Sequence, residues 1–280
     1  MGRSGYARRV SRRVSKAVEL LLEAYGHGAF PMAGSRHGRV DFYTADPRAI
    51  VPLEPGAVKL SRSLRAKVRR EPFTITSDAA FGEVVRACAD VPRRNPDGSK
   101  SGTWINDWII EAFGQLHAAG YAHSVEAWVE GEGTEGQGDK GTEGRAADVA
   151  EWQSGEVAKG KTMHRRAEVD DTGRVLVGGL YGVAIGGAFF GESMFSRPDL
   201  GGTDASKVCF VHLLEHLRRR GYVLLDTQFS NPHMEQFGIV EIPLHDYMER
   251  LRPALGRKVG WGEFVEHQPA AGTHTSGETP

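Results

Sequence analysis

The segment from Val175 to Arg197 most constrains the fold, because it predicts two β-strands joined by a tight turn. β-Branched and aromatic residues form the first arm, and a Gly-Gly pair before the second arm is typical of a two-residue hairpin. Side chains alternate along a regular strand, so one face of the second arm would carry Phe190, Glu192, Met194 and Ser196. We therefore expect a carboxylate beside a thioether here, and look for a site at this hairpin.

Length and composition predict a soluble protein. The chain has 280 residues, 40% hydrophobic and 25% charged, enough for one large domain or two modest ones. No apolar run approaches the roughly 20 residues of a membrane span. The first residues also lack the apolar core of a secretory signal, so we expect a cytoplasmic protein without a membrane partner. Cys88 and Cys209 lie in apolar patterns, which favours buried thiols over disulfides or zinc ligands.

The formal net charge is −1, but the basic residues are clustered. One cluster precedes Glu19, with a composition that a transit peptide could also have. A second runs from Ser61 to Arg70 with the pattern of a helix. Either could contact nucleic-acid phosphates, or be a solvated helix face. The candidate phosphate-binding residues of the second cluster are Arg62, Arg65, Lys67, Arg69 and Arg70.

Apolar residues at helical spacing predict further helices, with polar residues before them as candidate N-caps. The segments are Val18–Tyr25, Phe81–Cys88, Thr103–Ala119, a helix from Thr203 or Asp204 to Gly221, and Asp246–Leu251. Ser77 or Asp78 is the candidate cap of the second and Thr103 that of the third. In the third helix, Trp104 and Trp108 are expected to lie in the core.

Two extended segments carry aromatic residues that are candidates for stacking. Phe42 and Tyr43 are adjacent, so one is expected in the core and the other free to stack, although both could be core. In HSVEAWV, from His123, one face carries Ser124, Glu126 and Trp128. That face could line a cleft, with Trp128 as a stacking platform.

A parallel crossover is predicted after the hairpin, because the helix ending at Gly221 is followed by the strand YVLLDTQ. Asp226 and Gln228 would be neighbours at the carboxyl end of this strand, where open α/β sheets bind ligands. Between the two earlier strands, residues 131–173 are Gly- and Glu-rich and predict an inserted flexible loop.

Several kinds of site are excluded. The segment GESMF lacks the second glycine of a nucleophile elbow, so Ser193 is not a hydrolase nucleophile. There is no HExxH motif, Cys pair or P-loop, and we expect neither a metal nor a cofactor. Gly201 and Gly202 before a helix are a weak signal for an anion site, which leaves an acyl-CoA-dependent N-acyltransferase as an alternative.

The motifs AYGHGAFP, ADPRAI, SRSL, GTWI, AHSVEAW, LVGGLYGVAIGGAFFGESMFSR, ASK and LLDTQ occur in the order that they have in one family. On these motifs the chain closely resembles the bacterial leucyl/phenylalanyl-tRNA–protein transferases, from Ala24 to about Leu251. The resemblance implies an α/β (α+β) protein with a smaller N-terminal α/β domain over residues 1–72. It also implies an acetyltransferase-like (GNAT) catalytic domain over 73–262, and we expect a disordered tail over 263–280.

The resemblance further implies transfer of Leu or Phe, with Met as a further candidate, from aminoacyl-tRNA to proteins with N-terminal Arg or Lys, marking them for degradation. Gln228 would accept a hydrogen bond from the attacking amine, and Asp226 would orient and polarise Gln228. Glu192 would pair with the basic acceptor side chain. The residues implied to contact the substrates in other ways are Met194 near the transferred side chain, and Trp128, Phe42 and Tyr43 near the 3′ adenosine. Ser193 is a further candidate for substrate binding.

Departures from the family pattern affect the adenosine site. Phe42 and Tyr43 stand where members usually have paired tryptophans, and Met32 replaces another tryptophan. Leu244 and His245 replace a usual Arg pair. A non-catalytic tRNA-binding module is therefore a second alternative to the transferase. We expect a monomer.

Overall fold

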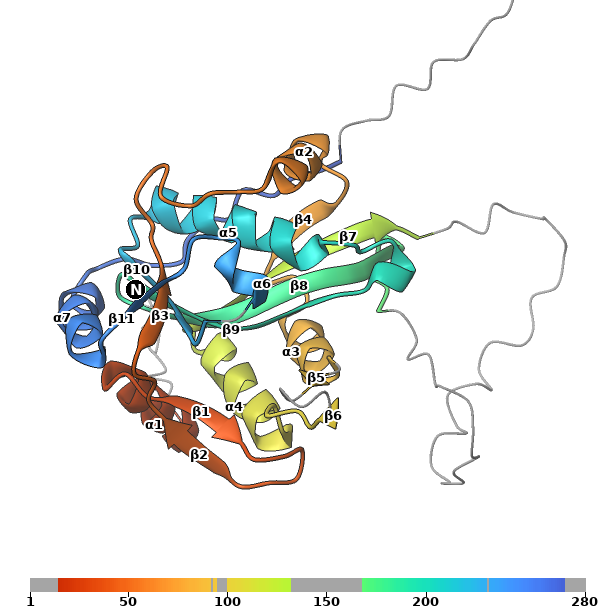
Figure 1. Cartoon of the computed structure of the whole chain (residues 1–280). Coiled ribbons are helices and arrows are strands. Elements are labelled where there is room, and N and C mark those ends of the chain that lie inside the picture. Colours follow the sequence, from red (N-terminus) through yellow and green to blue (C-terminus); the bar gives the residue numbers. More distant parts are fainter. Residues whose placement is uncertain (1–14, 92, 95–99, 132–167, 231, 270–280) are drawn as a thin grey trace, which may run out of the picture.

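The computed structural model describes residues 15–91, 93–94, 100–131, 168–230 and 232–269 (Figure 1). The helices are α1 (Lys16–Gly26), α2 (Arg62–Arg70), α3 (Phe81–Ala89), α4 (Asp107–Ala118), η1 (Pro198–Leu200), α5 (Ala205–Arg220), α6 (Pro232–Glu235) and α7 (Leu244–Leu255). The strands are β1 (Phe30–Ala33), β2 (Val40–Tyr43), β3 (Arg48–Val51), β4 (Thr74–Ser77), β5 (Arg93–Arg94), β6 (Lys100–Ser101), β7 (Ala122–Glu130), β8 (Arg174–Ile185), β9 (Ala188–Ser196), β10 (Leu224–Gln228) and β11 (Val240–Ile242).

A mixed sheet of seven strands forms the centre of the fold, in the order β11, β3, β10, β9, β8, β7 and β4. The predicted hairpin is confirmed as β8 and β9, which turn at Gly186 and Gly187. The predicted crossover is also confirmed, because β9, α5 and β10 follow one another and β9 pairs with β10 in parallel. The other pairings in this sheet are antiparallel.

Helices cover both faces of the sheet (Figure 1). Helix α5 packs on β7, β8 and β9 from one side, while α3 and α4 pack from the other. The core is accordingly divided into two clusters, and the adjacent residues Phe189 and Phe190 contribute to different ones. We call the side of Phe190, with α1, α3, α4 and α7, the α1 face, and the side of Phe189 the α5 face.

A β-bulge at Glu192 changes which side chains of β9 share a face. Gly191 pairs with Gly182 and Ser193 with Tyr181, so Glu192 is the extra residue. After the bulge, Phe195 packs in the cluster of the α1 face and Met194 against that of the α5 face. The expectation that Glu192 and Met194 lie side by side on one face is therefore wrong, because a bulge shifts the alternation by one residue.

Three expected helix caps differ in the structure. Helix α3 has no side-chain cap, because the Asp78 carboxylate accepts the backbone N–H of Ser124 at 2.9 Å. Helix α4 begins at Asp107 rather than after Thr103, and the side chain of Asn106 caps it. Asp204 occupies the N-cap position of α5, but its carboxylate forms ion pairs with lysines instead of capping the helix.

The aromatic residues also differ from expectation. Trp108 is 38% exposed rather than buried, while Trp128 is only 3% exposed. Phe42 and Tyr43 are both exposed, because β2 pairs with β1 in a separate two-stranded ribbon. Neither of the two is a core residue.

The boundary between two domains at residue 72 stays a prediction. Strand β3, which belongs to the predicted N-terminal domain, lies in the same sheet as β10 of the predicted catalytic domain. Within the tail expected from residue 263, the structure describes residues 263–269, where His267 exchanges backbone hydrogen bonds with Ile75. Residues 1–14, most of the predicted insertion (132–167) and residues 270–280 lie outside the described part of the chain. Cys88 and Cys209 are both buried and form no disulfide, as predicted. None of the described helices is both long enough and apolar enough to cross a bilayer.

Candidate active site

Asp226 is fully buried, and its carboxylate accepts four hydrogen bonds. Its carboxylate accepts two hydrogen bonds from Arg48, Nε to Oδ1 at 2.9 Å and Nη2 to Oδ2 at 2.6 Å. The hydroxyl of Tyr247 donates to Oδ2 at 2.7 Å, and the backbone N–H of Gln228 donates to Oδ1 at 2.8 Å. Both carboxylate oxygens are therefore satisfied within the protein, which is the condition for burying an ion pair without a large penalty.

Arg48 is held as firmly as its partner. Its side chain has 0% exposure, and Nη1 donates to the carbonyl oxygen of Gly28 at 2.8 Å. The guanidinium lies over the rings of Phe30 and Tyr247, at 4.8 and 4.7 Å from their centroids. Burial alone would lower the pKa of Arg48, but the hydrogen bonds to Asp226 and the negative charge of that residue together outweigh this effect and raise it, so Arg48 stays ionised.

Gln228 is positioned by an irregularity at the end of β10. The pairing with β3 shifts between Asp226 and Gln228, and Gln228 has a left-handed backbone with φ of 58°. The hydrogen bond from its N–H to Asp226 closes this turn. The contact between these residues is thus made by the backbone of Gln228, and its side-chain amide is left to point elsewhere.

Glu192 receives that amide. The Nε2 of Gln228 donates to Oε1 of Glu192 at 3.3 Å, and the hydroxyl of Tyr25 donates to the same oxygen at 2.7 Å. Within the described residues no further hydrogen bond reaches Oε2 of Glu192 or Oε1 of Gln228. The partly exposed Glu192 therefore offers a carboxylate oxygen, and Gln228 a carbonyl oxygen, at one place where β9 and β10 stop pairing.

The carboxyl of Glu192 is hard to ionise. Although the residue is partly exposed, the surrounding protein desolvates the carboxyl and raises its pKa from the ordinary 4.5 to about 8, and the charge of Asp226 adds to this effect. The hydrogen bond from Tyr25 and the charge of Arg48 act in the opposite direction without cancelling it. Perturbed carboxyls of this kind are concentrated at functional sites. A cation placed beside Glu192 would favour its ionised form.

The other predicted substrate-contacting residues lie apart from this group. Met194 is partly buried on the α5 face, and Ser193 is partly exposed opposite Tyr181. Trp128 is buried, donates from Nε1 to Thr76 at 2.8 Å, and has the Arg174 guanidinium 5.7 Å from its ring centroid. The polar face of β7 is not open to solvent, since Glu126 is fully buried and accepts hydrogen bonds from Ser124 and Thr76.

The five basic residues predicted to bind phosphates lie on α2. Lys67 is held to the start of α5, with Nζ 2.7 Å from the carbonyl oxygen of Thr203. The remaining four are at least partly exposed, and no acidic side chain of the described residues lies within ion-pair distance of them; they are Arg62, Arg65, Arg69 and Arg70.

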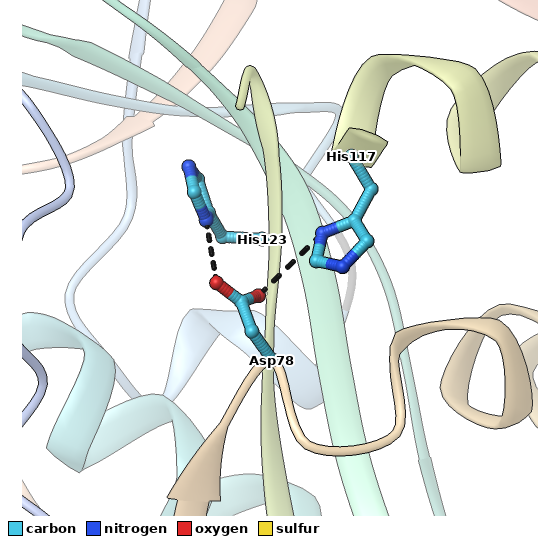
Figure 2. Close-up of side chains that lie close together, drawn as sticks. All are labelled: Asp78, His117 and His123. Carbon is cyan, nitrogen blue, oxygen red and sulfur yellow. Dashed lines mark hydrogen bonds and ion pairs between the residues drawn. The ribbon is translucent and has the colours of Figure 1, made fainter. Parts of the chain in front are cut away.

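A cluster of Asp78, His117 and His123 has the composition of a metal site (Figure 2). Figure 2 shows both imidazoles turned toward the carboxylate of Asp78, which follows β4. The Nδ1 of His123 lies 2.8 Å from Asp78, and the Nδ1 of His117 lies 2.8 Å from the carbonyl oxygen of Ala122. Because both nitrogens already have hydrogen-bond partners, the cluster is adequately explained as a clamp between α4, β7 and the loop after β4.

Three residues of the site were not identified from the sequence: Tyr25, Arg48 and Tyr247. Arg48 lies within the quoted motif ADPRAI, but spacing gave no sign of its partner 178 positions away. Tyr25 and Tyr247 follow the apolar spacing of their helices and are typical of core residues. Their hydroxyl contacts could be found only from the tertiary structure.

Removing the positive charge of Arg48 should strongly destabilise the protein. We expect Arg48→Met to lower the free energy of unfolding by about 3–5 kcal/mol, because Asp226 is then left as an unpaired buried charge. Urea unfolding followed by circular dichroism measures this change. Arg250→Met, on the exposed side of α7, is the control. Equal stability of the two variants would contradict the proposed importance of the ion pair.

The raised pKa of Glu192 predicts a pH-dependent cost. The protonated group contributes stability that is fully present below its unfolded pKa of about 4.5 and is lost as pH rises to about 8. Glu192→Gln cannot ionise, so it should be more stable than the wild type by roughly 1–3 kcal/mol above pH 8, and about equal at pH 4.5. Urea unfolding at several pH values tests this. The exposed Glu249→Gln should parallel the wild type, and a parallel curve for Glu192→Gln would refute the assignment.

Comparison with known proteins shows the family of this chain. The family model described as leucyl/phenylalanyl-tRNA protein transferase matches residues 52–137 and 161–252. Proteins named leucyl/phenylalanyl-tRNA–protein transferase include one from Rubrobacter xylanophilus, 44% identical over 85% of this chain and 94% of its own, and one from Gloeobacter violaceus, 41% identical over 86% and 95%. One from Chlorobaculum tepidum is 39% identical over 87% and 98%. The chain thus belongs to the leucyl/phenylalanyl-tRNA protein transferase family.

Proposed function

We propose that this protein is an aminoacyltransferase that moves leucine or phenylalanine from an aminoacyl-tRNA to the α-amino group of an acceptor protein. The observation that carries the proposal is the similarity to named transferases over about 85% of the chain. The supporting geometry is the group formed by Glu192, Asp226 and Gln228 at the end of the parallel strand pair, which is where open sheets commonly bind ligands.

The reaction requires no nucleophile from the protein. The acceptor's α-amino nitrogen attacks the ester carbonyl of the aminoacyl-tRNA, a C–N bond forms, the C–O bond breaks, and the terminal ribose hydroxyl leaves. An α-amino group has a pKa of about 8, so an appreciable fraction is neutral near pH 7. Holding the two reactants together lowers the barrier by about 7–11 kcal/mol. A positioned proton acceptor raises the rate by a factor of about 10²–10⁴, which corresponds to only about 3–5 kcal/mol. Positioning is therefore the main task of the site.

Gln228 and Glu192 have separate roles in this proposal. The carbonyl oxygen of Gln228 accepts a hydrogen bond from the attacking amine, because its Nε2 is already directed to Glu192. Asp226 keeps Gln228 in its left-handed conformation through the backbone. Glu192 pairs with the side chain of an N-terminal Arg or Lys, whose charge would favour the ionised carboxylate.

The remaining assignments rest on the family resemblance. Met194 borders the apolar cluster of the α5 face, where the transferred side chain would be accommodated. Trp128, with the exposed Phe42 and Tyr43, would contact the 3′ adenosine, and the Trp128 ring becomes more accessible if Arg174 moves. The β9–α5–β10 crossover suits the acetyltransferase-like fold. A monomer in the cytoplasm that marks its acceptors for degradation completes the proposal.

The acyl-CoA alternative is not favoured. Position 202 requires glycine for packing, since a Cβ there would lie 2.3 Å from the carbonyl oxygen of Val177. The N-cap of α5 is Asp204, and the hydrogen bond and charge of Lys207, together with the charge of Lys67, lower the pKa of this carboxyl. It is therefore negatively charged at neutral pH. A carboxylate at that position would repel a pyrophosphate.

A transfer assay tests the proposed function. The full chain is incubated with leucyl-tRNA carrying labelled leucine and a peptide with N-terminal Arg, and label on the peptide is measured. We expect transfer by the wild type and a loss of about 10²-fold or more in Gln228→Asn, which tolerates the left-handed backbone but shortens the side chain. Gln115→Asn is the matched control.

Each alternative has its own outcome in this assay. Leucyl-tRNA binding without transfer, while an established family member is active, would favour the tRNA-binding module over the transferase. Unchanged transfer by Gln228→Asn would remove this residue from the mechanism.

The arginines of α2 are the proposed contacts for tRNA phosphates. The double variant Arg65→Gln, Arg69→Gln should weaken tRNA binding and reduce the slope of log affinity against log salt by about 1 for each phosphate that is no longer neutralised. Binding is measured by fluorescence anisotropy over a range of salt concentrations. The charge-matched control is Arg250→Gln, Arg252→Gln on α7, and an equal slope in the two double variants would exclude α2 from the interface.

A further inference from the structure

Three potential metal ligands meet on the α5 face, away from the candidate active site. His212 and Glu215 are three positions apart on α5, which places them on the same side of that helix. His267 comes from the segment after α7. One ligand atom from each of the three residues lies within 4.8 Å of the other two.

The position of His267 is fixed by the sheet. Its backbone N–H donates to the carbonyl oxygen of Ile75 at 3.1 Å, and its carbonyl oxygen accepts from the N–H of Ile75 at 2.8 Å. The neighbouring Gln268 accepts a hydrogen bond from Thr74 at 3.2 Å. The C-terminal segment therefore pairs with the edge strand β4 and presents His267 to α5, where its imidazole centroid lies 4.2 Å from that of His212.

His212 carries the observation that points to a ligand. The residue is 6% exposed, and its Nδ1 is buried without a hydrogen-bond partner. A buried polar atom that lacks a partner is uncommon in a folded protein and often indicates an ion or a water.

The cluster in Figure 2 also contains a buried nitrogen without a hydrogen-bond partner, Nε2 of His123, but this atom lies on the side of the ring that faces away from Asp78. There the Nδ1 atoms of His117 and His123 are both engaged in hydrogen bonds. Within the described residues, no hydrogen bond or ion pair occupies the side chains of Glu215 and His267. Their donor atoms are therefore available to an ion.

We infer that His212, Glu215 and His267 form a site for a divalent transition-metal ion of the zinc class, which ties the C-terminal segment to α5. Two imidazoles and one carboxylate are donors that zinc prefers, and three protein ligands leave a fourth position for water. Zinc–nitrogen bonds of about 2.0–2.1 Å in tetrahedral geometry require donor atoms roughly 3.3 Å apart. The ligand atoms now lie within 4.8 Å of one another, and rotation of the exposed Glu215 side chain and the partly exposed His267 side chain can bring them to that shorter separation.

Zinc and cobalt titrations of the full, metal-free chain test the site. We expect one ion per chain by equilibrium dialysis, a cobalt complex with the visible absorption of a four-coordinate ion, and a melting temperature that rises with zinc. Glu215→Gln and His267→Ala should each weaken zinc binding by at least about 10-fold. The control is His245→Ala, which changes an exposed cluster with Asp246 and Glu249.

The variants also give the results that would overturn the inference. Wild-type affinity in both Glu215→Gln and His267→Ala would do so, as would the absence of zinc binding by the wild type. Binding that is lost in His117→Ala instead would assign the ion to the cluster of Figure 2. If His267→Ala fails to fold, Glu215→Gln decides, since it changes one exposed side chain on a helix. Transfer activity in zinc-free solution is expected to be unchanged in Glu215→Gln, because Glu215 is an exposed residue of α5 with no role in the proposed transfer site.

Discussion

The buried ion pair between Arg48 and Asp226 fixes the arrangement on which the rest of the site depends. It joins β3 to β10, and the same two side chains contact Tyr247 on α7 and the carbonyl oxygen of Gly28 after α1. Removing two charges from water is expensive, and the cost is offset only when every donor and acceptor is satisfied. Four separate segments must therefore reach their final positions together. Once they have done so, Gln228 has its unusual backbone conformation as a consequence.

Two irregularities at the end of one parallel strand pair build the site. A bulge at Glu192 and a register shift after Asp226 occur where β9 and β10 stop pairing. Regular strands would alternate strictly, and the side chains that follow would face other partners. The irregularities let Glu192 and Gln228 meet on the α1 face, while Met194 is turned to the α5 face. A carboxylate and an apolar surface thus lie on either side of the sheet at one point, which suits a reaction with one charged and one apolar substrate group.

The sequence predicted those features of the structure that depend on residues close together in the chain. The Gly186–Gly187 turn and the β9–α5–β10 crossover both followed from spacing and turn chemistry. The strand pattern also brought Asp226 and Gln228 to the end of β10, but not the left-handed backbone through which Gln228 contacts Asp226. The bulge at Glu192 did not, because period-two alternation has no place for an extra residue. Arg48, Tyr25 and Tyr247 were missed because their partners lie far away in sequence. The exposure of Trp108 was misjudged because apolar spacing cannot distinguish a half-covered face from a buried one. Trp128 was expected to line a cleft because its strand face is polar, but Glu126 on that face is hydrogen-bonded inside the protein.

The properties of Glu192 connect stability to the proposed reaction. A carboxyl with a pKa of about 8 is mostly protonated at neutral pH, and ionising it costs free energy in the folded protein. A cationic acceptor side chain would supply a compensating charge, so acceptor binding and loss of the proton become coupled. A neutral side chain would gain no such interaction and would meet an uncharged carboxyl. Under the proposed function, desolvation of Glu192 would favour an acceptor with a basic N-terminal residue, and the hydroxyl of Tyr25, which stabilises the anion, would lower the pH at which the carboxylate forms.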